Sequence, residues 1–280
     1  MASIIETIRV RRSCRTYSDE PLEPQKLSEL REFLQANVTG PFGGSLRFRL
    51  VDIDELTSVE RRPLGTYGVI RGARLFIAGA VRRGPQAMED YGYAMENNIL
   101  KATSLGLGTC WLGGTFRRSG FAARMNLTEK ELLPAISPVG YPGQKRSVTE
   151  RFFRFSAGSD ERKAWNELFY DRDAATPLSR ESAGRHDAVL ECVRIAPSAS
   201  NKQPWRIIRS AGAFHFYLCK TPRYDAFFKD IPLQSIDMGI AMCHFALASR
   251  ELGLEGIWKI QDPGIPSGEW IYVASWLFPG

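Results

Sequence analysis

The chain repeats part of its own sequence at an interval of 147 residues. The stretch 90–111 reappears as 237–258, and each copy reads as a long helix that ends in Gly-Leu and enters a strand near a tryptophan. Eight identities in register over about 20 positions indicate a tandem duplication. The identical pairs are Asp90/Asp237, Gly92/Gly239, Ala94/Ala241, Met95/Met242, Leu105/Leu252, Gly106/Gly253, Leu107/Leu254 and Trp111/Trp258.

The second copy is apolar from Gly239 to Ala248, with His244 as the clear exception. Because a helix that is apolar all round is buried all round, we predict that the two long helices pack against each other as a pseudo-twofold pair. His244 is then a hydrogen-bonded core residue. The predicted organisation is a single-chain pseudo-dimer with a first half at 1–158, a connecting helix and linker at 159–184, and a second half at 185–280.

The spacing of apolar residues predicts the remaining elements. A continuous apolar run at 75–81 predicts a strand that is covered on both faces. An amphipathic pattern predicts a helix at 160–170 with Trp165, Leu168 and Phe169 inward, followed by a polar linker. The other predicted elements are helices at 3–10, 25–35 and 189–195, and strands at 47–53, 136–141, 205–208 and 270–277.

The composition is that of a soluble globular protein with a sizeable core, since 44% of the 280 residues are hydrophobic and 24% are charged. No apolar run approaches the roughly 18 residues of a membrane span, and the sequence from Met1 to Glu6 does not read as a signal peptide. Five scattered cysteines without a CxxC pair predict free thiols in a reducing cytoplasm. The net charge of +6 fits solubility or phosphate-bearing ligands, while no nucleic-acid motif is present.

Ten residues at 196–205, Ala-Pro-Ser-Ala-Ser-Asn-Lys-Gln-Pro-Trp, form a candidate binding loop. Pro197 and Pro204 stop a helix from running through it. An apolar helix precedes the loop and a strand follows it, so the loop can present hydrogen bonds to a flat polar ring. Its short donors and acceptors are Ser198, Ser200, Asn201 and Gln203.

An arginine cluster after the first helix is a second candidate site. It consists of Arg11, Arg12, Ser13 and Arg15. Guanidinium groups and a hydroxyl suit the oxygens of a phosphate. Cations are also favoured at a helix C-terminus by its dipole, so the cluster by itself leaves both interpretations open.

Two glycine-rich segments allow close approach to a ligand. The segment Gly108–Gly114 leaves the first long helix, either to bring backbone N–H groups to a planar ring or as a helix C-cap and turn. The second segment is the turn Gly65–Gly68. Because the first half lacks the candidate loop and the second half lacks the arginine cluster, we predict one composite site between the halves.

Other chemistries find little support in the sequence. His186, His215 and His244 are too dispersed for a metal site or a Ser-His-Asp arrangement, and neither a GxGxxG nor a P-loop motif is present. Cys110 reads as a small core residue. With donors for an anion and a ring but no protein nucleophile, a cofactor is expected to bring the reactivity, and we assign no catalytic residue and no metal ligand.

These motifs resemble those of the FMN-dependent nitroreductase family. The shared motifs are Arg-Arg-Ser-x-Arg, Ala-Pro-Ser-x-x-Asn-x-Gln-Pro-Trp and Gly-Leu-Gly-Thr-Cys-Trp-Leu-Gly-Gly. Ordinary members carry all of them in one chain and form homodimers with two FMN sites across the interface, whereas this chain is similar to a subgroup with two fused nitroreductase-like halves. The resemblance implies an α+β nitroreductase-like sandwich with central long helices. We expect one FMN per chain, because each half lacks a motif of the other.

The resemblance also assigns residues to the cofactor. The phosphate and ribityl chain would be held by Arg11, Arg12, Ser13 and Arg15, joined by Lys145, Arg146 or Arg151. The isoalloxazine would be approached by the backbone of Leu112, Gly113 and Gly114, and its pyrimidine edge by Tyr67 and Gly68. The second half would contribute Pro197, Ser198, Ala199, Ser200, Asn201 and Gln203.

The implied activity is an NAD(P)H-dependent oxidoreductase that passes electrons to a small-molecule acceptor such as a nitroaromatic or a quinone. The protein would be cytoplasmic, a monomeric pseudo-dimer or weak homodimer, without nucleic-acid or membrane partners. Other reactions of the family remain open, namely reductive dehalogenation, flavin fragmentation and oxidation of a peptide-derived substrate. A non-catalytic flavin-binding or sensing module and a basic scaffold without flavin are the alternatives from other classes.

Overall fold

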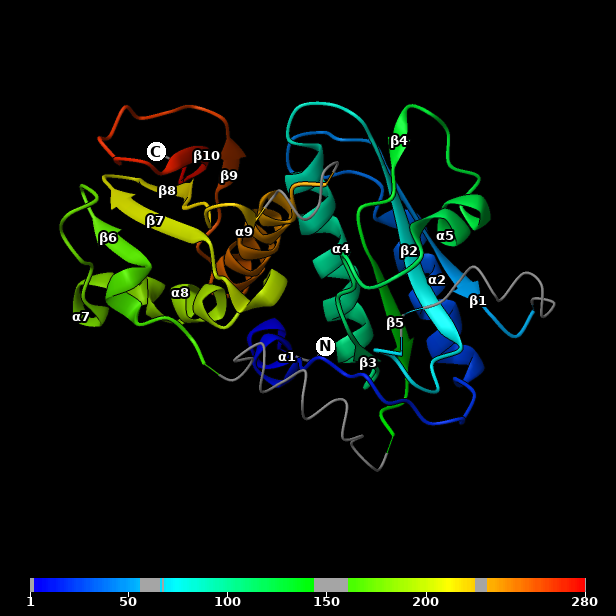
Figure 1. Ribbon diagram of the computed structural model, residues 1–280. Helices are drawn as coiled ribbons and strands as arrows, with labels where there is room; N and C mark the ends of the chain where they lie inside the picture. The colour runs from blue at the N-terminus through cyan, green and yellow to red at the C-terminus, as the bar shows by residue number, and fades with distance from the viewer. Residues whose placement is uncertain (1–2, 56–65, 67, 144–160, 225–230, 280) are drawn as a thin grey trace. The chain divides into compact units, whose positions relative to one another are not determined.

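The computed structural model describes residues 3–55, 66, 68–143, 161–224 and 231–279. The chain divides into two compact units, each with its own sheet (Figure 1). We call Val10–Gly158 the arginine unit; Met1–Arg9 together with Ser159–Gly280 form the loop unit. The N-terminal residues are thus grouped with the C-terminal part of the chain. The halves predicted at 1–158 and 185–280 are defined by the sequence repeat and not by contacts, so their boundaries stay a prediction.

The arginine unit contains a five-stranded antiparallel sheet in the order β1-β2-β5-β3, with β4 also paired to β2. The strands are β1 (Leu46–Asp52), β2 (Leu75–Arg82), β3 (Gly108–Thr109), β4 (Glu131–Leu132) and β5 (Ile136–Gly140). Its described helices are α2 (Pro24–Ala36), α4 (Ala87–Ser104) and α5 (Arg118–Arg124). The predicted elements at 25–35, 47–53, 75–81 and 136–141 are therefore confirmed within one or two residues.

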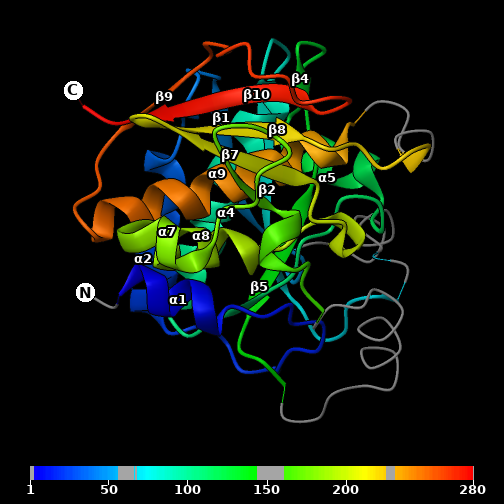
Figure 2. The same ribbon diagram turned by 90° about the vertical axis from the view of Figure 1, so that its left-hand side faces the viewer.

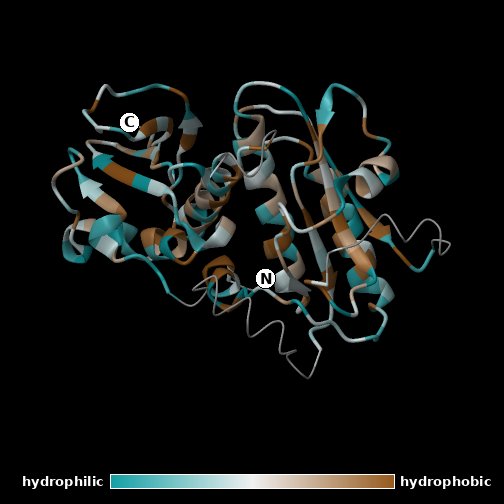
Figure 3. Cartoon of the chain, in the orientation of Figure 1, coloured by the Kyte–Doolittle hydropathy of each residue, from teal (hydrophilic) through white to brown (hydrophobic). Residues whose placement is uncertain are grey.

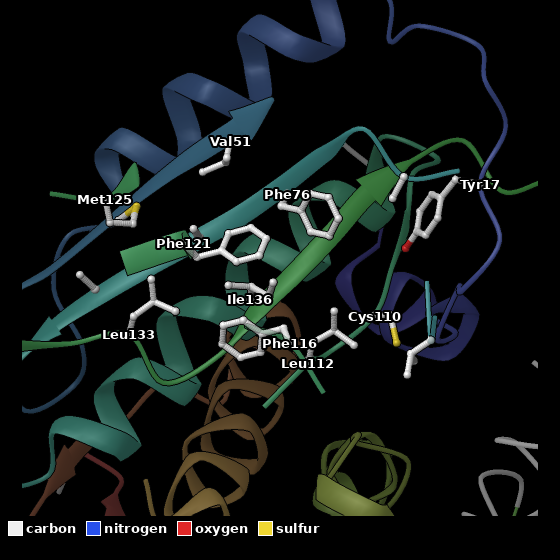
Figure 4. Packing of buried hydrophobic residues seen from close by; sticks show 14 residues of the cluster. Tyr17, Val51, Phe76, Cys110, Leu112, Phe116, Phe121, Met125, Leu133 and Ile136 are labelled. Atoms are coloured by element: carbon white, nitrogen blue, oxygen red, sulfur yellow. The ribbon is translucent and has the colours of Figure 1, made fainter. Parts of the chain in front are cut away.

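Strand β2 is buried on both faces, as its continuous apolar sequence predicts (Figure 3). On one face Gly79 lies so close to the rings of Phe48 and Tyr91, whose centroids are 5.7 Å apart, that it has no room for a side chain. On the other face Phe76 contacts Phe121 of α5 at 5.4 Å between centroids (Figure 4). Burial of side chains on both faces explains why the strand lacks an alternating polar pattern.

The loop unit contains a second five-stranded sheet, in the order β6-β7-β8-β10-β9, in which only β6 and β7 run parallel. Its strands are β6 (Phe169–Asp171), β7 (Trp205–Ser210), β8 (Ala213–Leu218), β9 (Ile257–Lys259) and β10 (Ile271–Leu277). Its described helices are α1 (Ile4–Val10), α7 (Arg180–Ala183), α8 (Asp187–Arg194) and α9 (Leu233–Glu251), and its short 3-10 turns are η2 (Trp165–Glu167), η3 (Gly184–His186) and η4 (Ala199–Asn201). The last residue of α1, Val10, already belongs to the arginine unit.

Helix α9 lies under the strands of the loop unit (Figure 2), and Phe245 meets Phe214 and Phe216 at 5.2 and 5.3 Å between ring centroids. The predicted burial of this helix is confirmed, since nearly every residue from Leu233 to Ser249 is buried. His244 is fully buried with its Nδ1 atom 2.9 Å from the carbonyl oxygen of Cys192. It is the hydrogen-bonded core histidine that the sequence predicts.

The two sheets share one strand order. Apart from α5 and β4 in the arginine unit and α1, β6 and α7 in the loop unit, each unit runs helix, loop, strand, strand, long helix, short strand, strand, and the last of these strands lies between the second and the third. Both long helices end in the same motif. Gly106 and Gly253 have positive φ angles of 78° and 66°, and the N–H groups of Leu107 and Leu254 donate to carbonyls five residues earlier. This is the Schellman pattern that glycine permits at a helix end.

The helix predicted at 160–170 is wrong. From Glu161 onward the chain is extended, then forms η2 and β6, where Phe169 pairs in parallel with Ile207. Leu168 and Phe169 are buried as predicted, and Trp165 is half-buried. The open edge of β7 supplies backbone partners that local periodicity cannot reveal, so tertiary pairing overrides the helical pattern. The linker predicted at 171–184 also contains a short helix, α7, whose Ser179 Oγ accepts from the N–H of Ser182 at 3.1 Å.

Candidate functional site

In the arginine unit, the chain from Arg11 to Tyr17 runs extended beside the sheet. Ser13 forms a parallel bridge with Thr109, and the N–H of Cys14 donates to the Thr109 carbonyl at 2.7 Å. The carbonyl of Arg15 accepts from the N–H of Arg71 at 2.9 Å. The backbone of the arginine cluster is therefore fixed by its hydrogen bonds to β3 and to Arg71, which precedes β2.

Arg11 is buried against an acidic residue of α4. Its Nε atom lies 3.8 Å from Oε1 of Glu96, which is fully buried and accepts from Trp111 Nε1 at 2.6 Å. Burial lowers the pKa of the Arg11 guanidinium, and the Glu96 carboxylate opposes that effect in part. A carboxylate that is fully buried on α4 requires a partner, and Arg11 and Trp111 provide two.

The donors of the cluster are not all used inside the described protein. Within the described ranges, Nε and Nη1 of Arg15 and Nε of Arg11 are buried without a hydrogen-bond partner. Arg12 is exposed, and its Nη1 donates to the carbonyl of Arg11 at 2.9 Å. Buried guanidinium donors without acceptors are costly. Such a donor set fits an anionic or oxygen-rich ligand.

The glycine-rich segment after α4 is held tightly by its own unit. Leu112 exchanges both backbone hydrogen bonds with Ile136, and the Gly113 carbonyl accepts from Arg118 Nη2 at 2.8 Å. A side chain at Gly108 would collide with Cys14. The helix-cap interpretation applies to Gly106, whereas Gly108 allows two chain segments to approach closely.

Several predicted residues of this unit lie outside the described residues: Tyr67, Lys145, Arg146 and Arg151. Gly68 is described, with a φ of 75°, and no atom of the described residues beyond its chain neighbours lies within 4 Å of the place a β-carbon would take. Gly114 is exposed beside Gly113. The cofactor roles assigned to all of these positions stay predictions.

In the loop unit, the candidate loop has a strained backbone. Ser200, Asn201 and Gln203 have positive φ angles of 48°, 53° and 47°. Non-glycine residues in this region cost of order 1–3 kcal/mol each, and they persist where the surrounding structure over-determines them. Three of them within four residues mark 197–203 as a functional candidate.

Hydrogen bonds from three sources outside the loop, and others within it, hold this loop. Oδ1 of Asp237, on α9, accepts from the N–H of Ala199 at 2.8 Å, and Ser198 Oγ accepts from the N–H of Gln203 at 2.9 Å. Ser200 Oγ lies 3.0 Å from the hydroxyl of Tyr224. The third source is the segment Glu161–Lys163, which contacts the side chains of Asn201 and Gln203. These two amides, predicted to face the cofactor, are engaged by that segment.

Asp237 was not predicted as a functional residue, although it is one of the repeated identities. It is fully buried, burial raises its pKa to about 8, and the N–H of Ala199 opposes that rise. Among the described residues its Oδ2 atom has no hydrogen-bond partner. The matching Asp90 accepts at both oxygens, from Phe42 N and Gly44 N at 2.8 and 2.7 Å. Each long helix thus carries an aspartate near its N-terminal end that accepts hydrogen bonds from the loop before β1 or before β7.

A pocket of about 490 Å³ in the loop unit contains no predicted site residue; its lining includes Arg185, His186 and Phe278. Among the described residues, no group of three or more His, Cys, Asp and Glu side chains is arranged to hold a metal ion. None of the described helices is long and apolar enough to cross a bilayer.

Comparisons with known proteins concern both fold and family. A family model described as "Putative TM nitroreductase" matches residues 3–249. The crystal structure of a "putative nitroreductase" from Thermotoga maritima is similar with a TM-score of 0.63 and 19% identity, covering 99% of this chain and 94% of that one. No curated protein matches the sequence.

Two shorter structures match about half of this chain. A nitroreductase with bound FMN from Bacteroides fragilis is 19% identical, with a TM-score of 0.42, over 53% of this chain and 92% of its own. An NADH dehydrogenase/NAD(P)H nitroreductase from Parabacteroides distasonis, described as putative, is 24% identical, with a TM-score of 0.41, over 51% and 89%.

Proposed function

Because the chain belongs to this nitroreductase family, we propose that it is an FMN-dependent oxidoreductase that passes electrons from NAD(P)H to a small-molecule acceptor. The observation that carries the proposal is the set of buried guanidinium nitrogens, Nε of Arg11 and Nε and Nη1 of Arg15, that have no hydrogen-bond partner among the described residues. A phosphate with a ribityl chain offers the acceptor oxygens that such donors need.

The two units contribute different parts of the proposed site. The arginine unit would hold the phosphate and ribityl chain with Arg11, Ser13 and Arg15. The loop unit would present the loop 197–203, with its strained backbone at Ser200, Asn201 and Gln203, to the flavin ring. Since each unit carries only one of these two features in its sequence, we propose one FMN per chain.

We infer further that the two units descend from one ancestral unit. The inference is supported by the eight identities at one offset, the shared strand order and the Schellman motif at both helix ends. The two aspartates at matched positions, Asp90 and Asp237, both accept a backbone hydrogen bond from the loop that precedes a strand, β1 for Asp90 and β7 for Asp237. A composite site with unlike halves is what divergence after duplication would leave.

When bound, FMN supplies the redox chemistry by accepting a hydride and passing electrons on. The protein residues bind and orient it. Guanidinium groups compensate the phosphate charge, and a loop whose backbone is fixed before binding loses little entropy when it meets the ring.

The Arg15→Ala variant tests the phosphate assignment. We expect FMN affinity to fall by about tenfold or more, while the flavin-free protein is as stable as wild type or more stable, because a buried unpartnered donor set is removed. FMN fluorescence titration and urea unfolding give the two numbers. Arg82→Ala is the matched control, since Arg82 is an exposed arginine of the same unit. Unchanged FMN affinity in Arg15→Ala would argue against the assignment.

Turnover is tested separately. Anaerobic mixing of the flavin-loaded protein with NADH or NADPH should bleach the flavin absorbance, and a nitroaromatic or quinone should restore it. A bound flavin that neither nucleotide reduces would favour the flavin-binding or sensing module instead.

A further inference from the structure

The segment Glu161–Lys163 docks on the candidate loop within the loop unit. Arg162 Nη1 donates to Oδ1 of Asn201 at 2.8 Å, and Nδ2 of Asn201 donates to the Glu161 carbonyl at 2.8 Å. The N–H of Lys163 donates to Oε1 of Gln203, also at 2.8 Å. Because Asn201 and Gln203 are two of the three residues with positive φ, this segment binds the loop where its backbone is most strained.

Arg162 connects both ends of the turn. Besides Asn201, its guanidinium contacts the carbonyl of Ile195 through Nη2 at 3.4 Å. Ile195 is the C-cap of α8, immediately before the loop. The planar guanidinium donates along two fixed directions, so one side chain sets the distance between the end of the helix and the strained part of the loop.

The loop also makes hydrogen bonds to α9 and within itself, including one from Gln203 Nε2 to Oδ1 of Asn201 at 3.2 Å. Asp237 fixes Ala199, and Ser198 Oγ accepts from Gln203 N. Nε2 of Gln203 donates back to the Asn201 carbonyl at 3.1 Å. Asn201 is thus the position at which the loop's own hydrogen bonds meet those of the docked segment.

Resting on the proposed function, we propose that Arg162 is a positioning residue of the flavin site. It acts through Asn201, holding the backbone of 200–203 in its strained form, so that cofactor affinity depends on the docking of residues 161–163. A substitution at Arg162 would then alter FMN binding although the guanidinium donates hydrogen bonds to Asn201 and Ile195 and acts on the cofactor only through the loop.

The test compares Arg162→Ala with Lys163→Ala in the full-length protein. Lys163→Ala removes the same charge from the adjacent residue but keeps its backbone bond to Gln203, and the lysine Nζ lies 4.0 Å from Oε1 of Glu167, away from the loop's amides. For Arg162→Ala we expect about tenfold faster amide exchange at Asn201 and Gln203 in the flavin-free protein, and about tenfold weaker FMN binding. Lys163→Ala should match wild type in both.

Rescue separates positioning from a general loss of packing. Added methylguanidinium should restore slow exchange and FMN affinity to Arg162→Ala, whereas methylammonium should not. If Arg162→Ala fails to fold, Arg162→Lys is measured instead, with an intermediate effect expected because one donor direction is lost.

The exchange measurement needs no flavin, so it distinguishes this proposal from the proposed function. Wild-type exchange rates in the arginine variants would overturn the positioning role, whatever the protein binds. Faster exchange with unchanged FMN affinity would overturn the link to the flavin site. A wild-type protein that takes up no FMN would overturn the proposed function, and with it the flavin role of Arg162.

Discussion

Replacing Asp237 by asparagine should stabilise the protein at alkaline pH. Burial raises the pKa of this carboxyl to about 8, whereas an unfolded chain has an aspartate pKa near 3.9. Between these values the folded protein keeps a proton that the unfolded chain has lost, so folding stability falls as pH rises. Asparagine keeps an oxygen for the Ala199 N–H but does not titrate.

The magnitude follows from the width of that interval. Each pH unit is worth about 1.4 kcal/mol, so an interval of about four units amounts to roughly 5 kcal/mol by pH 8. Below about pH 4 the carboxyl is protonated in both states and the variant should differ little from wild type. The difference should then grow steadily with pH and level off above pH 8.

Urea unfolding of wild type and Asp237→Asn at several pH values from 4 to 9 measures this difference. Asp90→Asn is the matched control, because Asp90 uses both oxygens as acceptors for backbone N–H groups. In Asp90→Asn the new NH2 group would face a backbone N–H, donor against donor, so the free energy of unfolding should fall by about 1–3 kcal/mol. A difference between wild type and Asp237→Asn that stays constant with pH would refute the reasoning.

Three further substitutions test contacts of the described structure by urea unfolding. Gly44→Ala should destabilise the protein, because the added methyl group would collide with the Asp90 carboxylate, whereas Gly84→Ala, in open space, should not; equal stability of the two would contradict the contact. Glu96→Gln should cost about 3 kcal/mol by leaving the buried Arg11 without its counter-charge, and a variant as stable as wild type would show that the two do not act as a pair. Ser179→Ala should cost about 1 kcal/mol by removing the N-cap of α7, and no loss would mean that the cap is dispensable.

The sequence predicted the strongly patterned elements well. Strand β2 and helix α9 carry continuous apolar sequence, so their burial follows from composition over a short window. The ends of the loop at 196–205 were also predictable, because two prolines restrict the backbone there. Apolar runs and prolines act on the residues beside them in the chain, so their effect can be predicted without knowing which residues are neighbours in space.

Other features depend on neighbours that are distant in sequence. The segment predicted as a helix at 160–170 is extended, forms the turn η2 and enters β6 only at Phe169, where β7 offers an edge. The N-terminal helix belongs to the loop unit, where Ile5 N donates to Oε2 of Glu251 at 2.8 Å. Nothing within a few residues of either segment indicates these partners.

The same limit applies to residues around the candidate site. Arg162 is an ordinary charged residue by sequence, and its contact with Asn201 is visible only in the structure. Two signals were present but not used: Glu96 is a charge on a largely buried helix, and the Asp90/Asp237 pair belongs to the repeat.

The most direct test of the account is the number of FMN molecules bound per chain by the purified protein, from flavin absorbance and protein concentration after saturation with FMN and removal of the excess. The account predicts one flavin per chain. A colourless protein that takes up no FMN would contradict the cofactor assignment, and two flavins per chain would contradict a single site built from two unlike units.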